Sequence, residues 1–201
     1  EVASVSDALE QQLHLRRYMS HRMQQVSGGK FAGFAVTVRL EKDEGAANGT
    51  APMLAAIDTG ARDSVYVASI EDGENMTGIG GLMGTAMNTR GFAGAVIDGA
   101  ARDVGYLRKM GFAVYATGIT PSTVVGHYRA VRGLPVVCDG VPVSPGDVVT
   151  ADGDGVVVVP RAEAARIVVA AQQLDYTEHS MYGYIESLKS IEAAVAKFGR
   201  L

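Results

Sequence analysis

Apolar residues recur along the 201-residue chain with two spacings, which predict alternating strands and helices. Ser64–Ile70 and Ala93–Asp98 are short, almost uninterrupted apolar runs, as expected of strands covered on both faces. Leu82–Thr89 lies between them and has the spacing of a short helix. Four of its side chains are expected to be buried: Leu82, Met83, Ala86 and Met87. A strand, a helix and a second strand in this order predict a right-handed crossover between parallel strands, and therefore an α/β fold.

The remaining pattern adds elements on both sides of this unit. Val2–Leu13 has helical spacing, and Phe31–Leu40 alternates like a strand. Leu134–Val143 and Asp147–Val159 are rich in β-forming residues and are broken by turns, which predicts a second sheet or a partial barrel. The basic stretch Arg16–Gly29 is expected to be a solvated loop, although it could also face an anion or a neighbouring subunit.

The C-terminal part of the chain is predicted to be helical. Pro160 precedes the amphipathic segment Arg161–Asp175, and the same spacing continues through Tyr176–Leu201. The apolar stripe of this last segment has no evident core left to join. We therefore predict an α/β domain at residues 1–175 and a helical arm at residues 176–201, packed on another subunit; a loosely held amphipathic tail is the alternative.

Composition narrows the class of protein. Hydrophobic residues make up 47% of the chain and charged residues 20%, which is typical of a globular domain. The net charge of −4 gives no basic surface for nucleic acid. The single Cys138 can form no intrachain disulfide and is expected in the core. No apolar run is long enough for a membrane span and no signal peptide is evident, so we expect a cytoplasmic protein without a membrane partner.

Candidate chemistry gathers in two loops, Gly80–Met83 and Gly99–Asp103, which are predicted to lie at the carboxyl ends of neighbouring strands. The first loop offers backbone amides at a helix N-terminus, which favour an anion. Arg102 suits a carboxylate, and Asp103 is an oxygen ligand for magnesium or manganese. These residues predict a carboxylate-bearing substrate beside a metal ion. The alternative is an exposed Arg–Asp turn that caps the helix beginning near Val104.

Other motifs are weaker. The run GIGGLMG at 78–84 has Met83 where a dinucleotide-binding loop needs its third glycine. The four histidines lack metal-ligand spacing, and no GxSxG motif is present. Thr120, Ser122 and Thr123 could line the crevice, but a local turn explains them equally well.

Three stretches together resemble the RraA-like family: GGLM at 80–83, VIDGAARD at 96–103 and PVVCDGVPVSPGDVVTADGDGVVVVP at 135–160. The resemblance runs from about Val2 to Glu178. The family includes 4-hydroxy-4-methyl-2-oxoglutarate / 4-carboxy-4-hydroxy-2-oxoadipate aldolases, oxaloacetate decarboxylases and the regulator of ribonuclease activity A. It implies a compact α/β sandwich with a small β-barrel, assembled as a homotrimer or homohexamer with active sites at subunit boundaries.

The resemblance also implies roles for individual residues. Arg102 matches the arginine that binds the pyruvyl part of the substrate, and Asp103 matches the aspartate that binds magnesium directly. Leu82 and Met83 match the residues whose backbone amides hold the substrate carboxylate. Glu178 falls where a glutamate of a neighbouring subunit holds metal-bound water.

Gly80 and Gly81 complete the implied substrate-binding loop. In the aldolases an acidic residue precedes the two amide donors, whereas this chain has Gly81, which cannot move a proton. The implied function is a lyase, dependent on Mg²⁺ or Mn²⁺, that cleaves a C–C bond of a 2-oxo acid to give pyruvate, by aldol cleavage or decarboxylation. The alternatives are a protein-binding regulator of a ribonuclease, and a metal-assisted dehydratase or other lyase on a hydroxy or sugar acid.

Overall fold

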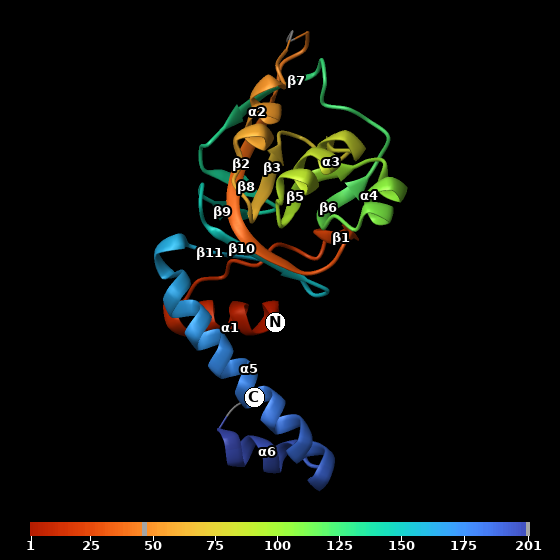
Figure 1. The fold of residues 1–201 in the computed structure, drawn as a ribbon. Coiled ribbons are helices and arrows are strands. Elements are labelled where there is room, and N and C mark those ends of the chain that lie inside the picture. The colour runs from red at the N-terminus through yellow and green to blue at the C-terminus, as the bar shows by residue number, and fades with distance from the viewer. Residues whose placement is uncertain (46–47, 200–201) are drawn as a thin grey trace.

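The computed structural model describes residues 1–45 and 48–199, and it contains one large mixed sheet with helices around it (Figure 1). The strands are β1 (Gln24–Ser27), β2 (Phe31–Lys42), β3 (Ser64–Ile70), β4 (Thr77–Ile79), β5 (Gly94–Ala101), β6 (Val114–Ile119), β7 (Tyr128–Arg132), β8 (Val136–Cys138), β9 (Val141–Val143), β10 (Val148–Asp152) and β11 (Gly155–Val159). The helices are α1 (Val2–Leu13), α2 (Ala51–Thr59), α3 (Gly81–Arg90), α4 (Val104–Met110), the 3-10 turn η1 (Arg161–Glu163), α5 (Ala164–Leu188) and α6 (Ile191–Phe198).

The centre of the sheet is parallel, as the crossover pattern predicts. Strand β3 pairs with β2 on one side and with β5 on the other, and β4 and β6 both pair with β5. The long strand β2 pairs in turn with β10, β3 and β7, so the sheet curls into a nearly closed barrel. The predicted second sheet is limited to the β8–β9 hairpin, because β10 and β11 join the main sheet.

Two apolar layers cover the parallel strands. Helices α2, α3 and α4 lie on one face, where Ile57, Met87 and Leu107 are fully buried. The other face lines the interior of the barrel, where Val96 packs in the same cluster as Cys138. Strand β5 therefore lies between two cores, which explains its almost uninterrupted apolar run. The complete burial of Cys138 confirms that this cysteine is a core residue.

Helices α1 and α5 form a third layer against β11 at the outside of the barrel. Helix α5 then extends away from the body, and α6 packs back near its far end (Figure 1), where the rings of Tyr184 and Phe198 make an edge contact. The boundary predicted after Asp175 falls inside α5, which continues across it as a single helix. That the arm packs on another subunit stays a prediction.

The predicted burial of Leu82 is wrong. Its side chain is 89% exposed, whereas Gly84 and Met87 form the buried face of α3. Leu82 lies roughly 200° around the helix axis from Gly84, which places it on the opposite side of α3. Met83 and Ala86 pack partly against the core. Leu82 therefore lies at the exposed start of α3, beside the loop predicted to bind a ligand, and does not belong to the core.

Candidate functional site

The first half of the candidate site follows strand β5. The backbone amide of Arg102 donates to the carbonyl of Ile79, 3.0 Å away, which ties the end of β5 to the end of β4. Asp103 then adopts the left-handed conformation (φ 55°) and starts α4. This conformation is uncommon outside glycine, and aspartate tolerates it better than most residues. The turn places both side chains at the carboxyl edge of the parallel sheet.

The second half of the site is the start of α3. The amide of Gly81 donates a 2.8 Å hydrogen bond to Oδ2 of Asp103. At Gly80, an added Cβ would lie 2.9 Å from the same oxygen and 3.1 Å from Nε of Arg102. A side chain at position 80 would therefore displace Asp103 and Arg102, and the glycine lets these two side chains lie directly against the loop. The structure therefore brings together the two loops that the sequence predicts at one crevice.

Arg102 lies between Asp103 and the following loop. Its Nη1 donates to the carbonyl of Ser122 at 3.3 Å, and its Nε is 3.9 Å from Oδ2 of Asp103. The two side chains are 43% and 53% exposed, so this ion pair contributes at most about 1 kcal/mol to stability. Both side chains therefore remain accessible to a ligand.

Two adjoining hollows flank these residues. One of about 470 Å³ is lined by Gly81, Leu82, Thr85, Asp103, Val104, Gly105 and Tyr106. The other, of about 420 Å³, is lined by Arg102, Asp103, Val104, Ile119, Thr120 and Pro121. Because both hollows include Asp103, a small acid bound there would contact groups from both loops. Thr120 thus lies at the crevice, whereas Thr123 lines a different pocket.

Leu82 and Met83 occupy the first turn of α3, where backbone amides have no partner within the helix. The helix dipole adds partial positive charge at this end. The amides immediately follow Gly81, whose own amide already contacts Asp103. The start of α3 is therefore a suitable place for a carboxylate.

Glu178 is not brought to this site within one chain. It lies on α5, where one of its carboxylate oxygens accepts a 2.7 Å hydrogen bond from the hydroxyl of Tyr182. Helix α5 packs on α1 and extends away from α3 and α4 (Figure 1). That a second copy of the chain places this glutamate near Asp103, as the resemblance implies, stays a prediction.

The donor set is sparse for a metal. In residues 1–45 and 48–199, no three His, Cys, Asp or Glu side chains cluster in a way that could hold an ion. Among the described residues, Asp103 is the only carboxylate that lines the two hollows. Magnesium and manganese often bind one or two carboxylates together with water and substrate oxygens. The half-exposed Asp103 fits an ion of that kind, but it does not fit a closed protein cage.

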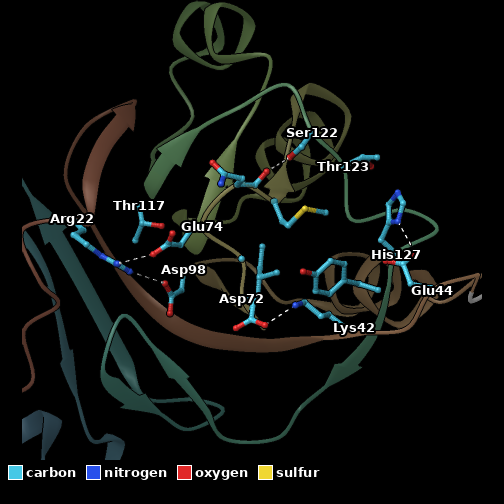
Figure 2. Close-up of a pocket in the computed structure, with 15 residues that line it drawn as sticks. Arg22, Lys42, Glu44, Asp72, Glu74, Asp98, Thr117, Ser122, Thr123 and His127 are labelled. Carbon is cyan, nitrogen blue, oxygen red and sulfur yellow. Dashed lines mark hydrogen bonds and ion pairs between the residues drawn. The ribbon is translucent and has the colours of Figure 1, made fainter.

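A larger pocket, of about 950 Å³, lies at the mouth of the barrel (Figure 2). The stretch Arg16–Gly29, which contains Arg22, was expected to be a solvated loop, but Gln24–Ser27 forms strand β1 and Met23 is buried. The acidic partners of Arg22 were not predicted. Arg22 reaches Glu74 at 3.6 Å, Asp139 at 3.6 Å and Asp98 at 4.0 Å. Burial raises the pKa of Asp98, and the nearby Asp139 carboxylate adds to the effect. An aspartate at the end of the apolar run in β5 was the available signal, because a polar residue in such a strand needs partners.

The polar groups of this larger pocket satisfy one another. Lys42 lies 2.6 Å from Asp72, and His127 lies 2.8 Å from Glu44. Figure 2 shows both pairs. The Ser122 hydroxyl donates to the backbone carbonyl of Asn75 at 2.6 Å. These contacts show that many of the charged and polar side chains at the mouth of the barrel have partners there. The smaller hollows differ in that the backbone amides of a helix N-terminus lie beside the arginine and the carboxylate.

Comparisons with known proteins identify the family to which this α/β fold belongs. A family profile described as RraA-like (Aldolase/RraA) matches residues 2–158. The chain therefore belongs to the RraA-like family. This confirms the resemblance seen in the sequence and the α/β fold with its barrel-like sheet.

Individual relatives share about a third of their aligned residues with this chain. A protein of Halalkalibacterium halodurans named "Putative 4-hydroxy-4-methyl-2-oxoglutarate aldolase" is 34% identical over 89 residues, 42% of this chain and 40% of that protein. Legionella pneumophila protein DlpA is 31% identical over 83% of this chain, which spans 27% of its length. The chain thus covers less than half of these two relatives.

Solved structures match over more of the chain. An uncharacterized protein from Pseudomonas syringae pv. tomato has a TM-score of 0.89 and 29% identity, over 98% of this chain and 89% of its own. Streptomyces coelicolor RraAS2, described as an unusual member of the RNase ES inhibitor RraA family, has a TM-score of 0.76 and 28% identity, over 91% and 90% of the two chains. Within the described residues, no helix is both long and apolar enough to cross a membrane.

Proposed function

We propose that this chain is a divalent-metal-dependent lyase that cleaves a C–C bond of a 2-oxo acid to give pyruvate. The observation that carries the proposal is the meeting of Asp103, Arg102 and the first turn of α3 at adjoining hollows. The aldolase name of the Halalkalibacterium halodurans relative supports the same reaction class. In this proposal the site holds a small acid by its carboxylate.

Each group has a chemical part in the proposal. Arg102 and the amides of Leu82 and Met83 bind the substrate carboxylate and stabilise the negative charge that develops on the pyruvyl part as the bond breaks. Asp103 holds Mg²⁺ or Mn²⁺, which when bound supplies Lewis-acid polarisation of the keto oxygen. Gly81 offers no proton-transferring group. Retro-aldol cleavage needs a base to take the hydroxyl proton, whereas decarboxylation does not, so oxaloacetate decarboxylation should tolerate Gly81 better.

The test is a screen of 2-oxo acids with Mg²⁺ and Mn²⁺, read out as pyruvate formation. The wild type is compared with Asp103→Asn, and with Asp58→Asn as a control at an exposed aspartate on α2. Loss of one charge-stabilising group typically lowers the rate by about 10²–10³-fold. We expect Asp103→Asn to show such a loss and Asp58→Asn to match the wild type. Equal turnover by Asp103→Asn, or no metal-dependent turnover by the wild type, contradicts the proposal.

A second candidate is a protein-binding regulator of a ribonuclease. The observation in its favour is the likeness to RraAS2, whose description names RNase ES inhibition. A binding assay with a purified ribonuclease of the RNase E type distinguishes the two. Tight binding that lowers RNA cleavage, together with no turnover of any 2-oxo acid, favours the regulator.

We also propose that the chain forms a homotrimer or homohexamer. Several large apolar side chains on α5 and α6 are exposed in the single chain, among them Tyr176, Leu188 and Ile191, at 72%, 50% and 55%. Large exposed apolar surface is typical of a subunit contact. Assembly would also give Glu178 a route to a neighbouring site.

A further inference from the structure

Arg102 is held between two backbone segments. Its amide donates to the carbonyl of Ile79 at the end of β4, and its Nη1 donates to the carbonyl of Ser122 in the loop after β6, at 3.0 and 3.3 Å. Within the part of the chain that the structure describes, Nη2 of Arg102 has no partner. The N–H groups of Nη2 are therefore available to a carboxylate oxygen, while the Ser122 carbonyl fixes the direction of the guanidinium.

The Ser122 carbonyl is held in place by the side chain of the same residue. The Ser122 hydroxyl donates to the carbonyl of Asn75 at 2.6 Å and accepts a hydrogen bond from the amide of Thr77 at 3.0 Å. Thr77 is the first residue of β4 and is buried. The loop after β6 is thus attached to the start of β4, the strand whose other end is bonded to the amide of Arg102.

Thr120 attaches the same loop to β5. Its amide donates to the carbonyl of Ala101 at 3.1 Å, directly before Arg102. Its hydroxyl lies 2.8 Å from the Ser122 hydroxyl and 3.1 Å from the Asn75 carbonyl oxygen. The local side-chain bonds expected for the hydroxyl residues of this loop are therefore present. They also reach the candidate site, because they support the carbonyl that Arg102 contacts.

We propose, resting on the lyase function above, that Ser122 is a positioning residue for Arg102. Its hydroxyl holds the loop against β4, and its carbonyl then holds the guanidinium with Nη2 directed to the substrate carboxylate. Ser122 is not among the described residues that line the two hollows, so it acts through Arg102. Electrostatic stabilisation depends on donors that are oriented before the substrate binds. A displacement of about 1 Å can cost about 100-fold in rate.

The first test compares two neighbouring hydroxyl residues that are both partly buried in this loop (Figure 2). Ser122→Ala removes the bonds to Asn75 and Thr77, whereas Thr123→Ala removes a 3.1 Å bond from the amide of Val125 within the loop. We expect Ser122→Ala to lower kcat/KM for oxaloacetate decarboxylation by about 10- to 100-fold. Thr123→Ala should match the wild type, and Ser122→Thr, which keeps the hydroxyl, should restore most of the activity. Equal effects of the two alanine variants overturn the inference.

A double-mutant cycle separates positioning from a general loss of structure. If Ser122 acts through Arg102, Ser122→Ala should weaken pyruvate binding in the wild type and have no further effect in Arg102→Ala. Pyruvate affinity in the presence of Mg²⁺ is measured by NMR titration for the wild type, both single variants and the double variant. Mn²⁺ affinity without pyruvate should be unchanged in Ser122→Ala, because Asp103 keeps its place. Additive losses of pyruvate affinity, or an unchanged affinity in Ser122→Ala, overturn the inference.

Failure of this inference can be told apart from failure of the lyase proposal. If the wild type cleaves 2-oxo acids and Ser122→Ala does so equally well, the positioning role is overturned and the lyase function stands. If the two substitutions are coupled in pyruvate binding but no 2-oxo acid is cleaved, the positioning role is supported and the lyase function is overturned. Absence of both pyruvate binding and turnover in the wild type overturns both.

Discussion

The carboxylate of Asp103 accepts a hydrogen bond from the backbone amide of Gly81, with 2.8 Å between oxygen and nitrogen. Asp103 starts α4, yet its side chain makes no capping bond to that helix and reaches the start of α3 instead. This bond joins two loops that follow neighbouring parallel strands. A carboxylate accepts several hydrogen bonds, so Asp103 can keep this contact and still bind another ligand.

Gly80→Ala is expected to displace both charged side chains of the site. The new Cβ would lie 2.9 Å from Oδ2 of Asp103 and 3.1 Å from Arg102, which is too close. We expect turnover to fall about 100-fold or more, comparable to losing one charge-stabilising group. The matched control is Gly105→Ala, at a glycine near Asp103 where an added Cβ meets nothing within 4 Å. Pyruvate assays on both variants check this, and an equal effect of the two would contradict it.

The left-handed conformation of Asp103 (φ 55°) predicts a difference between two substitutions that both remove the carboxylate. Asp103→Gly suits the conformation, whereas Asp103→Ala is expected to be less stable by about 1 kcal/mol. Urea denaturation of both variants measures the difference. Equal free energies of unfolding would show that the backbone relaxes at this position.

Tyr66 carries a buried hydroxyl without a hydrogen-bond partner, the one such side-chain atom found in the described part of the chain. Burial also raises the pKa of this phenol. Tyr66→Phe removes the unsatisfied group and should stabilise the protein by about 1 kcal/mol. The control is the equally buried Tyr115, whose hydroxyl donates to the Asp152 carbonyl at 2.9 Å.

Tyr115→Phe should destabilise by about 1 kcal/mol, because the Asp152 carbonyl loses its donor. Thermal unfolding of both phenylalanine variants gives the comparison. The expectation fails if both changes shift the melting temperature in the same direction.

Asp98 predicts a specific pH dependence of stability. Burial raises its pKa in the folded state above the unfolded value, which is about 3.9. Ionisation of Asp98 therefore costs stability as the pH rises from the unfolded pKa through the folded pKa. Asp98→Asn lacks this cost and should gain stability relative to the wild type over that interval. Melting temperatures from about pH 3.5 to 7 measure the change, with Asp58→Asn as the exposed control. A difference that is constant with pH would contradict the prediction.

The C-terminal arm predicts the assembly state. Replacing Tyr176, Leu188 and Ile191 by serine removes exposed apolar surface from α5 and α6. If a second copy covers this surface, the mass measured by light scattering should fall from that of an oligomer towards that of one chain.

The control for the arm is a triple serine variant at three exposed polar positions of the same helices: Gln172, Glu186 and Glu192. It should keep the mass of the wild type. If the wild type is already monomeric, or if the triple variant at the apolar positions keeps the wild-type mass, the arm does not form the subunit interface.

Local pattern was enough to predict the framework of the fold. Ser64–Ile70 coincides with β3, and Val2–Leu13 coincides with α1. The residues predicted at one crevice, Gly80–Met83 and Arg102–Asp103, do meet. These predictions succeed because apolar period and crossover handedness are short-range properties that fix where the carboxyl ends of parallel strands lie.

Which strands close the barrel, the exposure of Leu82 and the cluster of Arg22 with Asp98 and Asp139 were decided only by the tertiary structure. Arg22 comes from a stretch with no regular pattern, and Asp139 from a hairpin turn. Their positions depend on how β2 curls past β10, β3 and β7, which is a long-range pairing. The sequence by itself determined which elements form and which two loops meet at the crevice. The tertiary structure decided which walls surround that chemistry, because packing between distant segments, and not local periodicity, sets which side chains remain exposed.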